Sequence, residues 1–139
     1  MTVRGAGRAV PVTVVLPART LLLDVSGPLE VLRRANMVQD AVRFDVSYVA
    51  ASRSIVSSIG LTLSGMRRLP ASLPDRSLVV VSGNVDRVMG SGATGAPGQA
   101  GDEAPIAAWL RGVIRPDHTL ITICSGALIA ARAGLLDGY

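Results

Sequence analysis

The chain has 139 residues, enough for one domain with a sizeable core, and its 14 arginines and 10 acidic residues leave a net charge of +4. Because the arginines are scattered and aromatic residues make up only 3%, we expect no nucleic-acid binding by this segment. The single cysteine excludes an internal disulfide, and no apolar run approaches the roughly 20 residues that span a bilayer. We therefore expect a cytoplasmic protein without membrane contact.

The first part of the chain predicts two strands and one helix. Residues 1–9 are polar and glycine-containing and are expected to form a flexible tail. The continuous apolar run Val10–Leu16 predicts a central strand that is buried on both faces. A helix is expected to start near Gly27–Pro28, because proline is tolerated in a first helical turn. The alternating segment Phe44–Ala50 predicts the second strand.

The middle of the chain continues this alternation. Residues 54–64 predict a small hairpin or an edge strand, and the apolar run Ser77–Ser82 predicts another buried strand. The glycine-rich segment 90–101 cannot bury enough apolar surface to offset its ordering entropy, so we expect a mobile surface loop. Pro105–Ile114 carries its apolar residues on one helical face. Strands that alternate with helices predict a mainly parallel sheet covered by helices.

The most informative stretch is a predicted strand, sharp turn and helix around the only cysteine. Leu120–Ile123 predicts a short buried strand, and the helix that follows is expected to stop at Gly134. Cys124 then stands at the carboxyl end of a strand, where ligands bind in open α/β sheets. The N–H groups of the helix end favour a thiolate there. Gly126 fits a corner too tight for a Cβ atom.

The residues alone leave the role of Cys124 open, because most free cysteines behave as small buried hydrophobic residues. His118, the only histidine, is expected at the opposite end of the same strand, roughly 20 Å away, as a turn residue. The sequence contains no metal-ligand cluster, phosphate-binding loop or dinucleotide fingerprint. We therefore expect neither a metal nor a cofactor.

Three segments together resemble the ThiJ/PfpI superfamily: Asp24–Val31, Leu78–Gly83 and Ile123–Ala127. The closing segment Ala133–Gly138 is also similar. The resemblance implies a three-layer α/β/α sandwich with a mainly parallel sheet, the class I glutamine amidotransferase-like (flavodoxin-like) fold. It also implies that the last strands and helix of that fold are missing, so residues 10–139 are expected to form a partial domain.

The resemblance assigns catalytic roles to Cys124 and Glu30. It implies that Glu30 lies beside Cys124 and donates a hydrogen bond that stabilises the thiolate. An ordinary glutamate of the first turns, paired with Arg34 four residues on, is the alternative. The backbone N–H groups of Gly83 and Ser125 are expected to hold an oxyanion or a carboxylate. A simple turn glycine explains Gly83 almost as well.

Further residues are expected at the pocket. Many superfamily members carry glycine at the position of Asn84, which tolerates a left-handed backbone better than most residues. Asp24 either caps the first helix or lines the pocket mouth, and capping is the favoured role. The predicted ligand-binding residues are therefore Gly83, Asn84, Ser125, Gly126 and Asp24.

Two functions compete on this basis. The motifs resemble most closely the sensor domains joined to AraC-type helix-turn-helix regulators, whose pocket binds a small, often nitrogen-containing metabolite. This implies a small-molecule ligand and a homodimer, with DNA bound only through a C-terminal domain absent from these residues. The alternative is a cysteine-dependent enzyme, either an isonitrile hydratase-like hydro-lyase or a glyoxalase- or amidase-type hydrolase. A degenerate, inactive fragment is the third possibility.

The chain stops just before the point where the superfamily carries the histidine partner of its cysteine. We therefore expect no catalysis from these residues alone.

Overall fold

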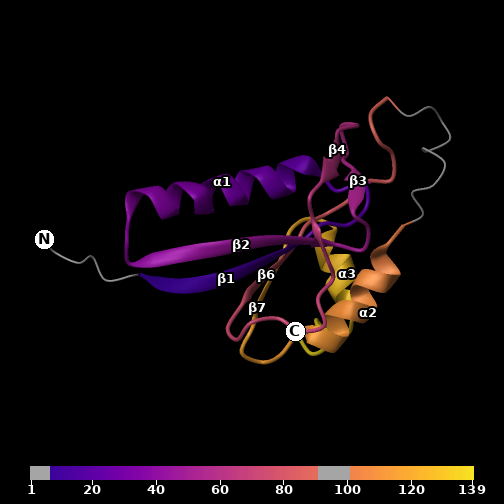
Figure 1. Cartoon of the computed structure of the whole chain (residues 1–139). Coiled ribbons are helices and arrows are strands. Elements are labelled where there is room, and N and C mark those ends of the chain that lie inside the picture. Colours follow the sequence, from indigo (N-terminus) through magenta and orange to yellow (C-terminus); the bar gives the residue numbers. More distant parts are fainter. Residues whose placement is uncertain (1–6, 91–100) are drawn as a thin grey trace, which may run out of the picture.

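The computed structural model of the chain describes residues 7–90 and 101–139, which form a parallel sheet between layers of helices (Figure 1). Five strands lie in the order β5-β2-β1-β6-β7, and each pairs in parallel with its neighbours. Their bounds are β1 (Arg8–Val15), β2 (Val42–Ala50), β5 (Arg67–Arg68), β6 (Leu78–Val81) and β7 (Thr119–Thr122). The mainly parallel sheet predicted from the sequence is confirmed.

Helices cover both faces of this sheet. On one face lies α1 (Leu22–Val38), together with the antiparallel hairpin formed by β3 (Ser54–Val56) and β4 (Thr62–Ser64). On the other face lie α2 (Glu103–Val113) and α3 (Gly126–Arg132) (Figure 1). The expected three-layer arrangement is therefore present.

The core consists of two apolar clusters separated by the sheet. Val14 and Val80 belong to the cluster under α1, whereas Val79 and Val81 belong to the cluster under α2 and α3. Successive strand residues point to opposite faces, so a strand buried on both faces must be apolar at every position. This is why the central strands appear in the sequence as continuous apolar runs.

Helix α1 begins earlier than predicted. It starts at Leu22 instead of near Gly27–Pro28, so Pro28 lies inside the helix. The missing N–H of Pro28 removes one helical hydrogen bond, but its ring lies on the exposed side of the helix. The residues that precede it include leucines with high helix propensity, which extend the helix toward the amino end. The earlier start places Asp24 in the first turn.

Most other boundaries lie within two residues of the prediction. Strand β1 begins at Arg8, inside the stretch expected to be a tail, and α2 begins at Glu103. The segment 54–64 forms a hairpin, one of the two expected forms, whereas the short β5 was not expected. The predicted mobile loop falls almost wholly on residues 91–100, which lie outside the described residues.

Candidate functional site

The turn between β7 and α3 holds Cys124 in a left-handed backbone conformation. Its φ is +53°, a value that non-glycine residues rarely adopt, and the residue is exposed. The N–H of Ile123 donates to the carbonyl of Val81 at 3.0 Å, and the N–H of Gly126 donates to the carbonyl of Ile123 at 2.9 Å. These two bonds fix the chain on both sides of Cys124. The sharp corner predicted from the sequence is present.

Gly126 allows α3 to approach the sheet closely. A Cβ atom at this position would overlap the carbonyl oxygen of Val81 and lie 3.0 Å from that of Ser82. Both oxygens belong to the backbone at the end of β6, so they cannot turn aside as a side chain can. Any larger residue would therefore push the first turn of α3 away from β6, as the sequence predicted for this corner.

Three side-chain atoms converge beside Gly83, just past the carboxyl end of β6. A Cβ atom at Gly83 would lie 2.7 Å from Oδ2 of Asp24 and 3.0 Å from both Cβ of Cys124 and Oγ of Ser125. All three atoms thus surround one point that a glycine leaves unfilled. The structure brings together four of the residues that the sequence assigned to the site.

Asp24 does not cap its own helix. Its Oδ2 accepts a hydrogen bond from the N–H of Gly83 at 3.2 Å, and the N-cap residue of α1, Leu21, makes no side-chain capping bond. The favoured capping role is wrong because the earlier helix start puts Asp24 three residues past the cap position. Its carboxylate lies instead at Gly83, next to the turn that holds the exposed Cys124.

Ser125 and Asn84 are joined by reciprocal hydrogen bonds. The N–H of Asn84 donates to Oγ of Ser125 at 2.9 Å, and this hydroxyl donates back to the carbonyl of Asn84 at 3.1 Å. Asn84 does not adopt the left-handed backbone that was expected. Its side-chain amide instead donates to Oε1 of Glu103 at 2.5 Å. The turn is thus held by side-chain bonds to α2 and α3.

The charged residues behind this turn, Glu103 and Arg19, were not predicted from the sequence. Oε1 of Glu103 also lies 3.6 Å from a guanidinium nitrogen of Arg19. Partial burial raises the pKa of Glu103, but hydrogen bonds from its own N–H and from Asn84, with the charge of Arg19, bring the pKa below its usual value. Two acidic residues at a helix start were the only available signal, and they suggest no more than a favourable helix dipole.

The other acid at this helix start, Asp102, is buried. Its Oδ1 accepts a hydrogen bond from the N–H of Ala18 at 2.9 Å, and its Oδ2 has no hydrogen-bond partner within the described ranges. Burial raises the pKa of Asp102, since a charged carboxylate loses hydration that one bond does not replace. Asp102 thus anchors the loop before α1 to the start of α2.

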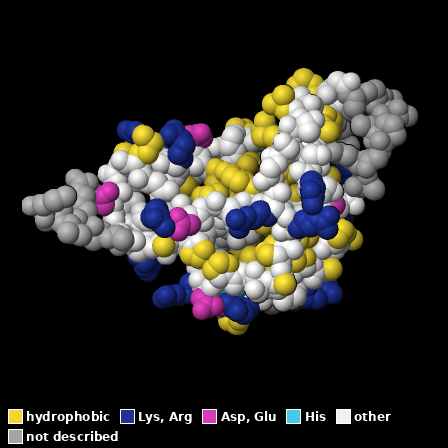
Figure 2. Space-filling view, in the orientation of Figure 1, with side chains coloured by type: hydrophobic (Ala, Val, Ile, Leu, Met, Phe, Trp, Pro, Cys, Tyr) yellow, Lys and Arg dark blue, Asp and Glu magenta, His cyan; other side chains and the backbone are white. Residues whose placement is uncertain are grey.

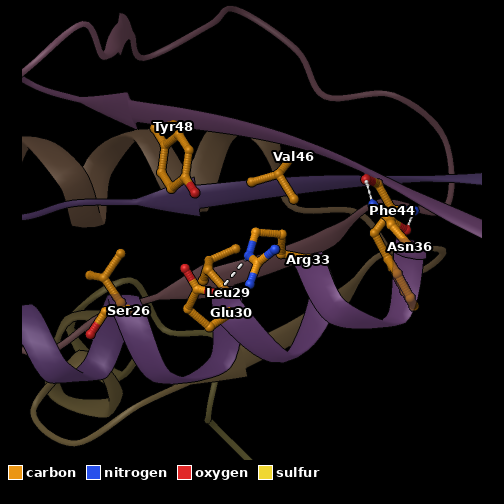
Figure 3. Close-up of a pocket in the computed structure, with 9 residues that line it drawn as sticks. Ser26, Leu29, Glu30, Arg33, Asn36, Phe44, Val46 and Tyr48 are labelled. Carbon is orange, nitrogen blue, oxygen red and sulfur yellow. Dashed lines mark hydrogen bonds and ion pairs between the residues drawn. The ribbon is translucent and has the colours of Figure 1, made fainter. Parts of the chain in front are cut away.

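Glu30 lies elsewhere, in a hollow of about 350 Å³ between α1 and β2 (Figure 3). Its carboxylate accepts a hydrogen bond from Nε of Arg33 at 2.6 Å, and its side chain is 64% exposed. Six residues of helix place it about 9 Å further along α1 than Asp24. The expected contact with Cys124 is therefore not made, and the ion pair forms with Arg33 instead of Arg34. The acid at the corner is Asp24.

His118 lies at the amino end of β7, as expected, and not beside Cys124. Its Nδ1 accepts a hydrogen bond from the N–H of Arg115 at 3.2 Å, and its Nε2 lies 3.1 Å from the carbonyl of Pro74. The chain contains no other histidine. No imidazole of these residues can serve Cys124 as a base.

The corner therefore gathers the exposed Cys124, the carboxylate of Asp24 and the hydroxyl of Ser125 around Gly83, and the hydroxyl is already bonded to Asn84. Of the two N–H groups expected to hold an oxyanion, that of Gly83 is already bound to Asp24. The N–H of Ser125 makes no hydrogen bond to any other group among residues 7–90 and 101–139. The site can thus donate to a ligand through Ser125 and accept from it through Asp24.

Across the described part of the chain there is no group of three or more His, Cys, Asp or Glu residues placed to hold a metal ion. In the same residues, no helix is both long enough and apolar enough to cross a membrane.

No protein-family model matches the chain. It is 34% identical over 118 residues to an uncharacterised protein in the cpoL 5′ region of Streptomyces lividans. The match covers 84% of this chain and 74% of the Streptomyces protein.

Three solved structures share the fold of the chain. A ThiJ/PfpI family protein from Pseudomonas syringae superposes with a TM-score of 0.65 at 19% identity, over 96% of this chain and 50% of that protein. An AraC family transcriptional regulator from Pseudomonas putida gives a TM-score of 0.63 at 20% identity, over 94% and 64%. A candidate transcriptional regulator from Vibrio parahaemolyticus gives 0.61 at 17%, over 93% and 63%.

The chain therefore spans between half and two thirds of the lengths of these solved proteins. At such identities the likeness concerns the fold, and the ThiJ/PfpI fold predicted from the sequence is confirmed.

Proposed function

The chain belongs to the family of the Streptomyces lividans protein and has the ThiJ/PfpI fold, and we propose that it is the small-molecule-sensing domain of an AraC-type transcriptional regulator. Its structural likeness to an AraC family regulator and to a second protein described as a transcriptional regulator supports this role at the level of the fold. Regulation of transcription would then require DNA binding by another domain of a longer protein.

One observation carries the proposal: Asp24, Cys124 and Ser125 converge on Gly83, each with an atom within 3.0 Å of where a Cβ atom would stand. Gly83 follows the carboxyl end of β6 and Cys124 follows that of β7, the edge of the sheet at which open α/β sheets bind ligands. The carboxylate of Asp24 accepts hydrogen bonds from an amine or amide, and the N–H of Ser125 donates to a carbonyl or carboxylate. The groups together suit a small nitrogen-containing molecule that carries both a donor and an acceptor.

The same groups are better arranged for binding than for turnover. General acid–base catalysis needs a group within hydrogen-bond reach that gives and takes protons near neutral pH. The only histidine lies at the far end of β7, so no imidazole stands beside Cys124. The corner can therefore hold a ligand through Asp24 and Ser125 but offers no imidazole to move protons.

A second candidate function rests on the backbone of Cys124. A residue with φ +53° between a strand and a helix exposes its side chain in the way that nucleophiles are exposed in hydrolases. In an isonitrile hydratase-like reaction, Asp24 would take the thiol proton, the sulfur would attack the isonitrile carbon, and Asp24 would return the proton to that carbon to give a thioimidate. Water would then add to the thioimidate carbon, and the thiol would leave with its proton to give an N-substituted formamide. This version replaces Glu30 by Asp24 as the acid.

Ligand binding can be tested by calorimetry and thermal shift with a panel of primary amides, amidines and amino acids. We expect a panel member to bind the wild-type chain and to lose binding in Gly83→Ala, whose methyl group would come within 3.0 Å of Asp24, Cys124 and Ser125 and displace them. The matched control is Gly112→Ala, since a Cβ atom there meets nothing within 4 Å. Unchanged binding in Gly83→Ala would refute a ligand site at this corner.

The enzyme alternative has its own assay. Incubation with an alkyl isonitrile should yield formamide in the wild-type chain and none in Cys124→Ala if Cys124 is a nucleophile. Labelling with iodoacetamide across pH adds a second measure, because a Cys124 that titrates as an ordinary thiol does not behave as an activated one. Turnover that depends on Cys124 would favour the enzyme over the sensor.

A further inference from the structure

The outer edge of β2 presents backbone groups away from β1. The carbonyls of Ala41 and Val49 accept hydrogen bonds at 3.0 and 2.9 Å from the N–H groups at the two ends of the β1 chain. Because successive residues of a strand turn their backbone groups to opposite sides, the odd-numbered residues of β2 face β1. The even-numbered residues turn their N–H and C=O groups to the outer edge of the strand.

Only part of this outward row is satisfied. Side-chain amides at the end of α1 bond the outward groups of Val42 and Phe44. Strand β5 pairs with β2 only from Val49 onward. Between these two blocks lie the N–H and the carbonyl of Val46 and the N–H of Tyr48, which make no hydrogen bond in the described part of the chain. The middle of the edge is therefore open to strand pairing.

Two hollows meet at this open stretch, and Val46 and Tyr48 line both. A groove of about 480 Å³ follows the strand edge and reaches Gly65 and Arg67, where β5 begins. The other is the hollow of about 350 Å³ between α1 and β2. In Figure 3 the side chains of Val46 and Tyr48 point toward α1, and that of Leu29 points back toward them. Figure 2 shows hydrophobic side chains at the surface between α1 and β2, with charged side chains around them.

The positive charge at the β5 end of the groove is not balanced. Arg67 is exposed and makes no hydrogen bond or ion pair with any residue that the structure describes. Arg33, which lines the other hollow, is instead paired with Glu30 on its own helix. An anionic group is therefore favoured beside Arg67, at one defined end of the groove.

An extended peptide that runs parallel to β2 matches the three open groups. In parallel pairing, a residue bonds to the neighbours of the residue opposite it. The N–H of Val46 would donate to the residue before its opposite residue, and its carbonyl would accept from the residue after it. The carbonyl of this last residue would accept from the N–H of Tyr48. The side chain opposite Val46 points to the same face as Val46, into the hollow against α1.

Strand β5 determines where such a peptide ends. The chain of β5 occupies the line of the edge from Arg67 onward, so an added strand has to stop there. A parallel peptide that stops at this point ends in a carboxylate beside the guanidinium. An antiparallel peptide would instead begin there and bring an ammonium group toward the same positive charge. The charge of Arg67 thus selects a carboxyl terminus.

We propose that the open edge of β2 binds the carboxyl-terminal residues of a partner polypeptide as an added strand. The penultimate residue is apolar and lies in the hollow between α1 and β2. The terminal carboxylate accepts from the N–H of Tyr48 and pairs with Arg67. This site shares no lining residue with the corner at Gly83, so it is independent of the proposed small-molecule ligand.

A library of random heptapeptides displayed with free carboxyl termini, selected on the purified chain, tests the site. We expect the selected sequences to share an apolar penultimate residue. A synthetic consensus peptide should then shift the nuclear magnetic resonance signals of the backbone N–H groups of Val46 and Tyr48 and leave that of Gly83 in place. A library without such enrichment, or shifts confined to other amides, would overturn the proposal.

The carboxylate contact can be tested separately. The consensus peptide should bind about tenfold or more weakly as its carboxamide, and Arg67→Glu should weaken the free-acid peptide by a similar factor. The matched control is Arg68→Glu, because Arg68 is an equally exposed neighbour that does not line the groove. Equal effects of the two substitutions would contradict a carboxylate bound at Arg67.

Filling the hollow should block the penultimate side chain. Ser26 is exposed and lines the hollow, so we expect Ser26→Trp to weaken peptide binding about tenfold or more. Gly27→Trp is the matched control, since Gly27 lies outside the hollow and its Cβ atom would meet nothing within 4 Å. Circular dichroism verifies that both variants fold. Unchanged binding in Ser26→Trp, or an edge closed by a second copy that no peptide displaces, would refute the site.

Discussion

Asp24 accepts a hydrogen bond at 3.2 Å from the backbone N–H of Gly83, a residue 59 positions further along the chain. The bond ties the first turn of α1 to the segment that follows β6. Because Cys124 lies in the turn between β7 and α3, the corner beside Gly83 depends on the packing of α1, β6 and α3 together. The candidate site is thus a product of the tertiary fold.

The Asp24–Gly83 bond should contribute to stability. We expect Asp24→Ala to lower the free energy of unfolding by about 1–2 kcal/mol, because the partly buried N–H of Gly83 loses its acceptor. Asp24→Asn should cost less, since its amide oxygen can still accept. Urea unfolding of the three proteins measures the difference. Equal losses in both variants would indicate that the bond itself contributes little.

Gly126 should tolerate no side chain. Its Cβ atom would overlap the backbone oxygen of Val81, so we expect Gly126→Ala to destabilise the fold by about 2–3 kcal/mol. Gly112→Ala provides the contrast, because its Cβ atom meets nothing and alanine is favoured in a helix by up to about 1 kcal/mol. Thermal or urea unfolding should move the two variants in opposite directions.

Much of the fold follows from patterns that the sequence displays directly. Central strands such as Leu78–Val81 must be apolar at every position because both faces are buried. The corner at Cys124 is equally local, since a short β-branched run, small residues and Gly126 are adjacent in the chain. Features of this kind need no knowledge of distant contacts.

The identity of the acid at the corner could not be read in the same way. Asp24 and Glu30 occur in one motif, and only the start of α1 decides which of them reaches Gly83. A helix that begins at Leu22 places Asp24 at the sheet edge and carries Glu30 away beside Arg33. The role of Asp102 was even harder to predict from the sequence, because its hydrogen-bond partner Ala18 lies 84 positions away in a loop.

Burial of Asp102 should make stability depend on pH. Its pKa in the folded state is raised by burial above the unfolded value of about 3.9. The protonated form is therefore favoured by folding, and its contribution is fully present below the unfolded pKa and is lost as pH rises through the folded pKa. We expect Asp102→Asn, which keeps an acceptor for Ala18, to gain stability relative to wild type as pH rises from 4 to 7.

Asp117 supplies a control of opposite sign. The N–H of Arg76 donates to its carboxylate at 2.9 Å, and this bond lowers the pKa of Asp117 despite an opposing desolvation effect. Its contribution is present above the unfolded pKa and is lost as pH falls through the folded pKa. Urea unfolding at several pH values should show Asp117→Asn losing stability relative to wild type as pH rises. Parallel pH profiles for the two variants would contradict both assignments.

The start of the outer edge of β2 is closed by two side-chain amides, one from the last turn of α1 and one from the residue that caps its carboxyl end. Asn36 accepts from the N–H of Phe44 at 2.8 Å and donates to its carbonyl at 2.9 Å. Gln39 makes the same pair of bonds with Val42: it accepts from the N–H at 2.9 Å and donates to the carbonyl at 2.6 Å. Strand β5 pairs only with the end of β2, at Val49 and Ala50. The amides therefore satisfy edge groups that would otherwise be open to strand pairing with another chain.

Removal of these amides should promote association through the sheet edge. We expect Asn36→Ala to lower the free energy of unfolding by about 1 kcal/mol, and Asn36→Ala with Gln39→Ala to aggregate on mild heating, because unpaired edge groups recruit strands. Light scattering below the unfolding midpoint measures this. Ser26→Ala is the control, since it also lines the hollow beside α1 and its hydroxyl does not contact β2 in any hydrogen bond of the described residues. A double variant as soluble as Ser26→Ala would show that another feature protects the edge.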